Sequence, residues 1–120
     1  MSKVLIVEDN ELNMKLFRDL LTIKKHDVIV SKDGIGVLDI AESKKPDLIL
    51  MDIQLNGISG LNLIEGLKKN SATKDIPIIA ISAFAMKQDE ITISSSGCDL
   101  YLAKPVAIAD FFQAIDRFLR

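Results

Sequence analysis

The stretch Leu-Ile-Leu-Met-Asp at residues 48–52 decides the fold class, because four consecutive apolar residues end on a carboxylate. A continuous apolar run, rather than an alternating one, is expected of a strand buried on both faces of a parallel sheet. The runs at 4–7 and 76–81 have the same character. Two weaker runs, at 28–30 and 100–103, are interpreted as further strands nearer the sheet edges.

Apolar residues at helical spacing fill the gaps between these strands. Leu12, Leu16 and Leu20 recur every four residues, and Asn10 stands where the N-cap of their helix is expected. Further helices are predicted around residues 37–41, 61–67, 86–94 and 108–119. The segment at 86–94 has the weakest helical propensity of these, because it is rich in isoleucine, threonine and serine.

Strands and helices therefore alternate along the whole chain, which predicts an α/β fold. Strict alternation favours a doubly wound parallel sheet with right-handed crossovers and helices on both faces. We predict the flavodoxin-like arrangement of five βα units, with the parallel strands in the order 2-1-3-4-5. The length of 120 residues fits a single domain that spans residues 1–120.

Composition narrows the classes of function. Fifteen basic residues face 17 acidic ones, so we expect no polycationic surface for nucleic acid or an anionic membrane. A single cysteine excludes an internal disulfide and suits a reducing compartment. The N-terminal residues lack the apolar core of a signal peptide, and no apolar run approaches the length of a membrane span. We expect a cytoplasmic protein.

Polar side chains stand just past the ends of the predicted strands. Glu8 and Asp9 follow the first strand, Asp52 the third, Ser82 the fourth and Lys104 the fifth. Ligands of open α/β sheets bind beyond the carboxyl ends of the strands, where the strand order reverses. Because the first and third strands are neighbours in the predicted order, we expect the three carboxylates to share one crevice, with the serine and the lysine along its side.

This set of side chains favours phosphoryl chemistry. Three carboxylates in one cleft repel one another unless a cation or protons intervene, and oxygen ligands of this kind suit Mg²⁺. A lysine and a hydroxyl beside them can hold phosphoryl oxygens. A carboxylate nucleophile, a metal ion and a positive charge are the parts needed to form an aspartyl phosphate. No glycine-rich nucleotide loop occurs in the sequence, so the phosphoryl group is expected from a donor other than a bound nucleotide.

Four stretches of the sequence carry a resemblance to a known family. They are Val-Leu-Ile-Val-Glu-Asp-Asn at 4–10, Asp-Leu-Ile-Leu-Met-Asp-Ile-Gln-Leu at 47–55, Ile-Ser-Ala at 81–83 and Tyr-Leu-Ala-Lys-Pro at 101–105. With these motifs the chain resembles a response-regulator receiver domain of bacterial two-component signalling, over its whole length. The segments 8–17 and 83–87 are also similar to single-domain cell-division regulators of the DivK type.

The resemblance implies a metal site and a phosphoacceptor. Asp52 would accept the phosphoryl group. Glu8, Asp9 and Asp52, together with the backbone carbonyl of Gln54, would bind Mg²⁺.

The resemblance also implies a switch on the other side of the phosphoacceptor. Ser82 would hydrogen-bond the phosphoryl group, and Lys104 would neutralise it. Tyr101 would change rotamer as Ser82 moves, although simple packing is an equally good interpretation of this tyrosine. The Lys104–Pro105 peptide bond would be cis. Ser82 stands where threonine is commoner in the family, a change that keeps the hydroxyl.

The function implied is that of a stand-alone response regulator that switches protein–protein binding in cell-cycle or division control. A histidine kinase or histidine phosphotransferase would be the donor. A downstream effector protein would bind the face made by the fourth helix, fifth strand and fifth helix. We expect a monomer that is not an enzyme beyond its own phosphorylation and dephosphorylation.

Other interpretations stay open at this stage. The chain could be a receiver cut from a hybrid histidine kinase. A small Mg²⁺-dependent phosphatase could use Asp52 as its nucleophile, but such enzymes usually carry a second acid two residues on, where Gln54 stands. A flavodoxin would have to bind phosphate with the loop at 8–11, which is anionic and lacks glycine.

Overall fold

Five strands and the helices between them make up the computed structural model of the chain, which describes residues 2–55, 57, 59–83, 91–93 and 95–119. The strands are β1 (Lys3–Val7), β2 (Asp27–Ser31), β3 (Leu48–Asp52), β4 (Ile78–Ser82) and β5 (Leu100–Ala103). The helices are α1 (Glu11–Ile23), α2 (Val37–Lys44), α3 (Gly60–Lys69) and α5 (Ile108–Phe118).

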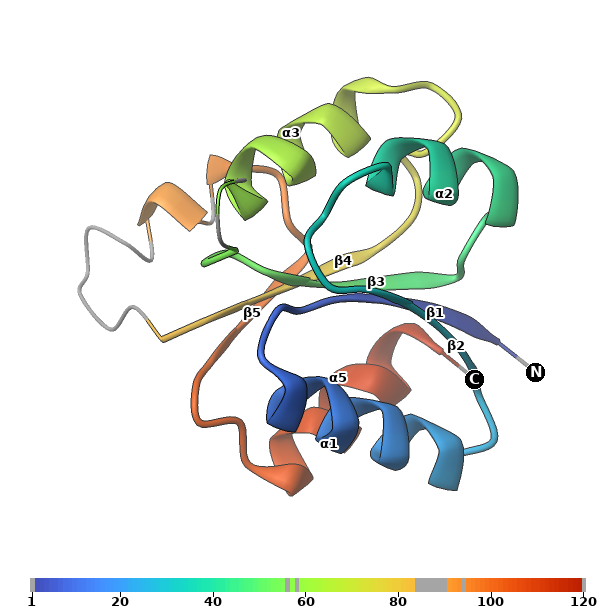
Figure 1. Cartoon of the computed structure of the whole chain (residues 1–120), viewed down its shortest axis with the longest axis vertical. Helices are drawn as coiled ribbons and strands as arrows, with labels where there is room; N and C mark the ends of the chain where they lie inside the picture. Colours follow the sequence, from blue (N-terminus) through green and yellow to red (C-terminus); the bar gives the residue numbers. More distant parts are fainter. Residues whose placement is uncertain (1, 56, 58, 84–90, 94, 120) are drawn as a thin grey trace.

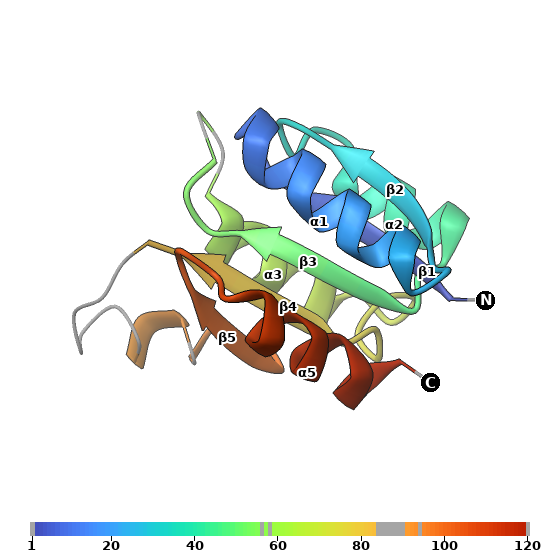
Figure 2. The ribbon, with the colours of Figure 1, turned by 90° about the horizontal axis from the view of Figure 1, so that it is seen from below.

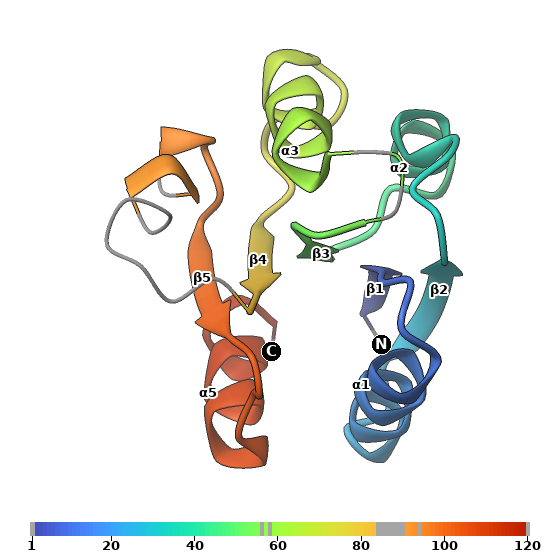
Figure 3. The same ribbon diagram turned by 60° about the vertical axis from the view of Figure 1, so that its left-hand side comes forward.

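The sheet confirms the predicted fold class and strand order. All five strands are parallel, and their spatial order is β2-β1-β3-β4-β5, with the two weaker apolar runs at the edges (Figure 3). The order reverses between β1 and β3, which are hydrogen-bonded neighbours in the register Val7↔Met51. The ends of β1 and β3 are therefore adjacent, as the site requires.

Helices cover both faces of the sheet. α1 and α5 lie together on one face, and α2 and α3 lie on the other (Figures 1 and 2). Alternate residues of each central strand face opposite layers: Ile6 packs with Phe17 and Phe111 on the α1/α5 side, and Leu5 packs with Ile64 on the α2/α3 side. The rings of Phe17 and Phe111 stack with centroids 5.2 Å apart. Burial on both faces explains why the strand sequences are continuously apolar.

The first helix begins where its sequence predicts. The Asn10 side-chain oxygen accepts a hydrogen bond from the backbone N–H of Asn13 at 3.0 Å, which confirms Asn10 as the N-cap. The helix therefore begins at Glu11, after the extended residue Asn10. This boundary leaves Glu8 and Asp9 at the end of the strand rather than within the helix.

Two sequence-based expectations differ from the structure. β4 begins at Ile78 and not at residue 76, because Pro77 has no N–H to donate to the ladder and Ile76 donates instead to the Thr73 carbonyl. Residues 91–93 and 95 are helical. The rest of the predicted helix at 86–94 lies outside the described residues.

Within the part of the chain that the structure describes, none of the helices has the length and apolar character needed to span a bilayer. Several large apolar side chains nevertheless stay exposed on the surface, including Leu12 on α1 and Ile108 at the start of α5.

Candidate functional site

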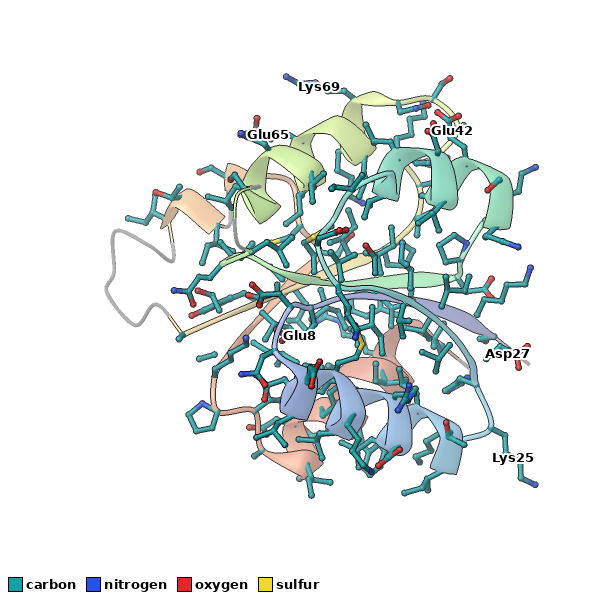
Figure 4. The ribbon with its side chains drawn as sticks, viewed as in Figure 1. Glu8, Lys25, Asp27, Glu42, Glu65 and Lys69 are labelled. Carbon is teal, nitrogen blue, oxygen red and sulfur yellow. The ribbon has the colours of Figure 1, made fainter. Side chains whose placement is uncertain are left out.

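The site lies at the carboxyl ends of the strands, and the side chains that form it are buried although they are polar. Glu8 directly follows β1, Asp52 ends β3 and Ser82 ends β4; their exposed fractions are 1%, 2% and 0%. Figure 4 shows Glu8 near the middle of the molecule between the sheet and α1, whereas Lys25, Asp27 and Lys69 project from its periphery. Buried carboxylates are costly unless they have partners, so their contacts define the site.

Lys104 is the cation that joins the two buried carboxylates. Its Nζ lies 3.0 Å from Glu8 Oε1 and 3.2 Å from Asp52 Oδ2. Lys104 directly follows β5, and its backbone N–H donates to the Ser82 carbonyl at 2.8 Å, which anchors the residue to the neighbouring strand. The ammonium therefore reaches across from the edge strand to the centre of the sheet.

Two backbone N–H groups complete the immediate surroundings of the carboxylates. Asp52 Oδ1 accepts a hydrogen bond from the Gln54 N–H at 2.9 Å. Glu8 Oε2 accepts one from the Asn10 N–H at 3.1 Å. The other Glu8 oxygen, Oε1, is buried and pairs with the Lys104 ammonium at 3.0 Å.

The site holds more negative than positive charge. Glu8, Asp9 and Asp52 each offer a carboxylate oxygen, and these oxygens all lie within 4.8 Å of one another. Lys104 is the cation that pairs with two of them. Burial, together with the close Asp52 carboxylate, raises the pKa of the Glu8 carboxyl to about 7.

The neighbouring carboxylates also change the pKa of Lys104. Burial alone would lower the pKa of the Lys104 ammonium, but its pairing with Glu8 and the negative charge of Asp52 outweigh burial and raise the pKa. The lysine therefore stays charged at neutral pH.

This arrangement fits a hard divalent cation. Three converging carboxylates, more than the one lysine can neutralise, supply oxygen ligands for such a cation. Mg²⁺ binds through a few carboxylates and keeps several waters. The half-exposed position of Asp9 leaves solvent access on one side of the cluster.

Gly60 fixes the backbone beneath Asp52. Its N–H donates to the Ile53 carbonyl at 3.2 Å, so the start of α3 lies directly against the end of β3. A Cβ at Gly60 would overlap the Asp52 carbonyl oxygen and approach Ile53 Cα to 2.7 Å. Only glycine lets α3 start this close to the carboxylate.

The remaining predicted site residues flank this centre. Ser82 is fully buried at the end of β4. Tyr101 lies on β5, half-buried against the apolar layer on the α2/α3 side. The Lys104–Pro105 peptide bond is cis.

Comparison with known proteins identifies the family. The model of the response regulator receiver domain matches residues 4–116. The chain belongs to the response regulator receiver domain family. The receiver is 48% identical over 116 residues to the polar-differentiation response regulator DivK of Brucella anthropi, a match that covers 97% of this chain and 94% of that protein. The DivK protein of Brucella ovis is equally similar, at 48% identity with the same coverage.

Solved structures of other receivers share the fold. The receiver domain of a sensor histidine kinase from Pseudomonas aeruginosa, which has a magnesium ion coordinated in its active-site cleft, superimposes with a TM-score of 0.89 at 30% identity. That match covers 98% of this chain and 96% of the other. A chemotaxis protein of Vibrio cholerae gives a TM-score of 0.90 at 22% identity, covers 99% of both chains and supports the fold alone.

Two features of the receiver site were not predicted from the sequence. The close approach of Gly60 to Asp52 depends on the β3–α3 loop, although a glycine shortly after a strand is a signal that could have suggested it. The Gln54 side chain accepts a hydrogen bond from the Ala83 N–H at 3.0 Å. No pattern in the sequence indicates this contact, because it joins two loops that only the folded sheet brings together.

The raised pKa of Glu8 predicts how stability depends on pH without Mg²⁺. The folded protein holds the Glu8 proton up to pH about 7, whereas the unfolded chain releases it near the ordinary value of 4.5. Between pH 4.5 and about 7, folding therefore takes up a proton. The free energy of unfolding should fall as the pH rises through this range. Each pKa unit corresponds to about 1.4 kcal/mol, so a rise from 4.5 to about 7 corresponds to a fall of about 3 kcal/mol.

Urea unfolding across this pH window, without divalent ions, measures the effect. Glu8→Gln should remove most of the fall, because glutamine does not titrate. Glu11→Gln, an exposed glutamate three residues further on, is the matched control and should keep it. A Glu8→Gln protein with the same pH dependence as wild type would show that Glu8 is not protonated in the fold.

Proposed function

We propose that this receiver accepts a phosphoryl group on Asp52 and that the modification switches its binding to other proteins. The observation that carries the proposal is the burial of Asp52 beside Lys104. The lysine neutralises only part of the negative charge of the three carboxylates around it. A carboxylate in that setting is a nucleophile with a cation placed to stabilise the charge that phosphoryl transfer develops.

Each residue has a distinct role in the proposed reaction. An Asp52 carboxylate oxygen attacks the phosphorus of a phosphohistidine, the phosphorus–nitrogen bond breaks, and the imidazole leaves with the bonding electron pair. Lys104, which now pairs with Asp52, would pair with a phosphoryl oxygen instead. The Ser82 hydroxyl would donate to another phosphoryl oxygen. Tyr101 would change its rotamer as Ser82 moves.

Mg²⁺ is the proposed cofactor, held by Glu8, Asp9, Asp52 and the backbone carbonyl of Gln54. When bound, it neutralises the carboxylate cluster and the transferring phosphoryl oxygens. The receiver structure from Pseudomonas aeruginosa, with magnesium in its active-site cleft, supports this choice of metal.

The proposed setting follows from the relatives. We infer a bacterial cytoplasmic protein whose residues 1–120 form one receiver domain, which acts in cell-cycle or division control as a DivK-like regulator. The identity of 48% to regulators named for polar differentiation supports this role. The receiver would catalyse only its own phosphorylation and dephosphorylation, act as a monomer, and bind neither nucleic acid nor membrane.

An apolar groove beside the site supports a histidine-bearing protein as the donor. Leu16, Phe17, Lys104 and Val106 line a groove between α1 and the loop after β5. Leu16, on α1, is 38% exposed and so offers an apolar contact at the groove. A helix of a histidine kinase or phosphotransferase that packs here would bring its phosphohistidine next to Lys104 and Asp52.

The output surface is proposed around β5, α5 and the segment 86–94. Tyr101, the exposed side of α5 and the segment 86–94 would bind a downstream effector. Residues 84–90 and 94 lie outside the described part of the chain. Ile91, which is described, is 67% exposed and supplies an apolar contact for such a partner.

Labelling with a small phosphodonor tests the assignment of Asp52. Incubation with acetyl phosphate and Mg²⁺ should add one phosphoryl group that hydroxylamine removes, because hydroxylamine cleaves acyl phosphates. Asp52→Asn should take up none, since an amide is not a nucleophile for this reaction. Asp39→Asn, an exposed aspartate on α2, is the matched control and should be labelled like wild type. Labelling that survives Asp52→Asn would refute the assignment, and rapid multiple turnover of the donor would indicate a phosphatase instead.

Phosphotransfer from a protein donor tests the groove. Leu16→Ala should slow transfer from a phosphorylated histidine kinase by about five- to tenfold, as expected when an apolar contact at an interface is truncated. Labelling by acetyl phosphate should not change, because that donor needs no docking surface. Ile23→Ala removes a more exposed apolar side chain, 69% against 38% for Leu16, from the far end of the same helix and should leave both rates unchanged. A Leu16→Ala protein that slows with both donors would place Leu16 in the site rather than in a docking surface.

A further inference from the structure

The Gln54 side chain makes a contact that the proposed roles do not use. Its Oε1 accepts a hydrogen bond from the Ala83 backbone N–H, 3.0 Å away and 29 residues distant in sequence. Gln54 stands two residues after Asp52, and Ala83 directly follows Ser82. The bond therefore joins the two loops that leave the site at the ends of β3 and β4.

This bond replaces a missing rung of the sheet. Ile53 N–H donates to the Ile81 carbonyl at 3.0 Å, and a regular parallel ladder would next bring the Ala83 N–H to the Ile53 carbonyl. That carbonyl accepts instead from the Gly60 N–H at 3.2 Å. The backbone of β3 has turned away toward α3, and the side chain of Gln54 supplies the acceptor that the backbone no longer offers.

A side-chain acceptor differs from a backbone acceptor because it can rotate away. The Gln54 side chain is exposed, so its amide loses little when water takes the place of Ala83. The Gln54 backbone N–H already donates to Asp52 Oδ1 at 2.9 Å, which fixes the residue beside the carboxylate. The side chain can therefore leave while the backbone keeps its place.

A phosphoryl group on Asp52 would be the stronger acceptor. It carries close to two negative charges and three oxygens, and a hydrogen bond to a charged oxygen is about twice as strong as one to a neutral amide. Lys104 and Ser82 supply donors on one side of Asp52. The Ala83 N–H is a further donor at the end of the neighbouring strand, held by Gln54 in the unmodified protein.

We propose that Gln54 is a positioning residue that holds the Ala83 N–H while Asp52 is unmodified and yields it to a phosphoryl oxygen when Asp52 is phosphorylated. The proposal rests on the proposed function of Asp52. The hydrogen bond of Gln54 therefore opposes phosphorylation by a small amount. Its release links phosphorylation of Asp52 to the position of the Ala83 backbone, directly after Ser82. Removing the acceptor should make the phosphorylated form easier to reach.

Beryllofluoride, which binds an aspartate carboxylate as a phosphoryl analogue, tests this in the presence of Mg²⁺. Gln54→Leu keeps the size of the side chain and removes the acceptor. In the free protein it should speed hydrogen exchange of the Ala83 amide, and it should tighten beryllofluoride binding by about two- to tenfold, the equivalent of one exposed hydrogen bond. In the beryllofluoride complex, the exchange rate of the Ala83 amide should be the same in variant and wild type.

Two further variants serve as controls. Gln54→Glu keeps an oxygen at the same position, so the Ala83 amide should exchange in the free protein as slowly as in wild type. Gln113→Leu makes the same amide-to-leucine change on the exposed side of α5 and should alter neither exchange nor affinity. Gln54→Ala repeats the test with a smaller side chain and should match Gln54→Leu.

The outcomes separate this proposal from the proposed function. If wild type binds beryllofluoride and both the leucine and the alanine variants bind it no more tightly, the role of Gln54 is overturned and that of Asp52 stands. Unchanged exchange of the Ala83 amide in the free variants would also overturn the role of Gln54. If wild type binds no beryllofluoride at all, the proposed function fails and this proposal fails with it.

Discussion

The ammonium of Lys104, set between the buried carboxylates of Glu8 and Asp52, is the interaction on which the site depends. Burying two carboxylates side by side at the end of a sheet is unfavourable, and a single cation offsets only part of that cost. In other proteins, replacing such a buried ion pair by apolar residues of similar volume is often neutral or stabilising. The proposed function gives these charges a role, because a divalent cation would bind on the acidic side and a phosphoryl group would bind beside the lysine.

The fold brings these groups together through strand order rather than through sequence proximity. β1 and β3 are neighbours because the order reverses between them, so Glu8 and Asp52 meet although 44 residues separate them. Lys104 reaches the same point from the edge strand β5, held by its backbone bond to Ser82. Gly60 completes the support, because any side chain there would displace the Asp52 backbone.

Much of this could be predicted from the sequence, for physical reasons. Continuous apolar strands such as residues 48–51 are typical of a sheet covered on both faces, and their alternation with helices predicts the α/β fold. A carboxylate directly after four buried apolar residues is costly without a partner, so the sequence predicts a site at Asp52. The start of β4 was predicted two residues early, because Ile76 fits the apolar pattern although Pro77 interrupts the ladder beside it.

Contacts made by loops could not be predicted in the same way. The position of the Gln54 side chain depends on the path of the chain from β3 to α3. That path requires the close packing of Gly60 against the Asp52 backbone. Neither has a periodic signature. The raised pKa of Glu8 likewise follows from burial and from the distance to Asp52, which are properties of the folded site alone.

The central claim is that Asp52, and no other carboxylate of the cluster, carries the phosphoryl group. Borohydride reduction of the phosphorylated protein, followed by peptide mass spectrometry, tests it most directly, because the reagent converts an aspartyl phosphate to homoserine at the modified position. We predict homoserine at position 52, with Glu8 and Asp9 unchanged. Reduction at position 8 or 9, with Asp52 intact, would contradict the account.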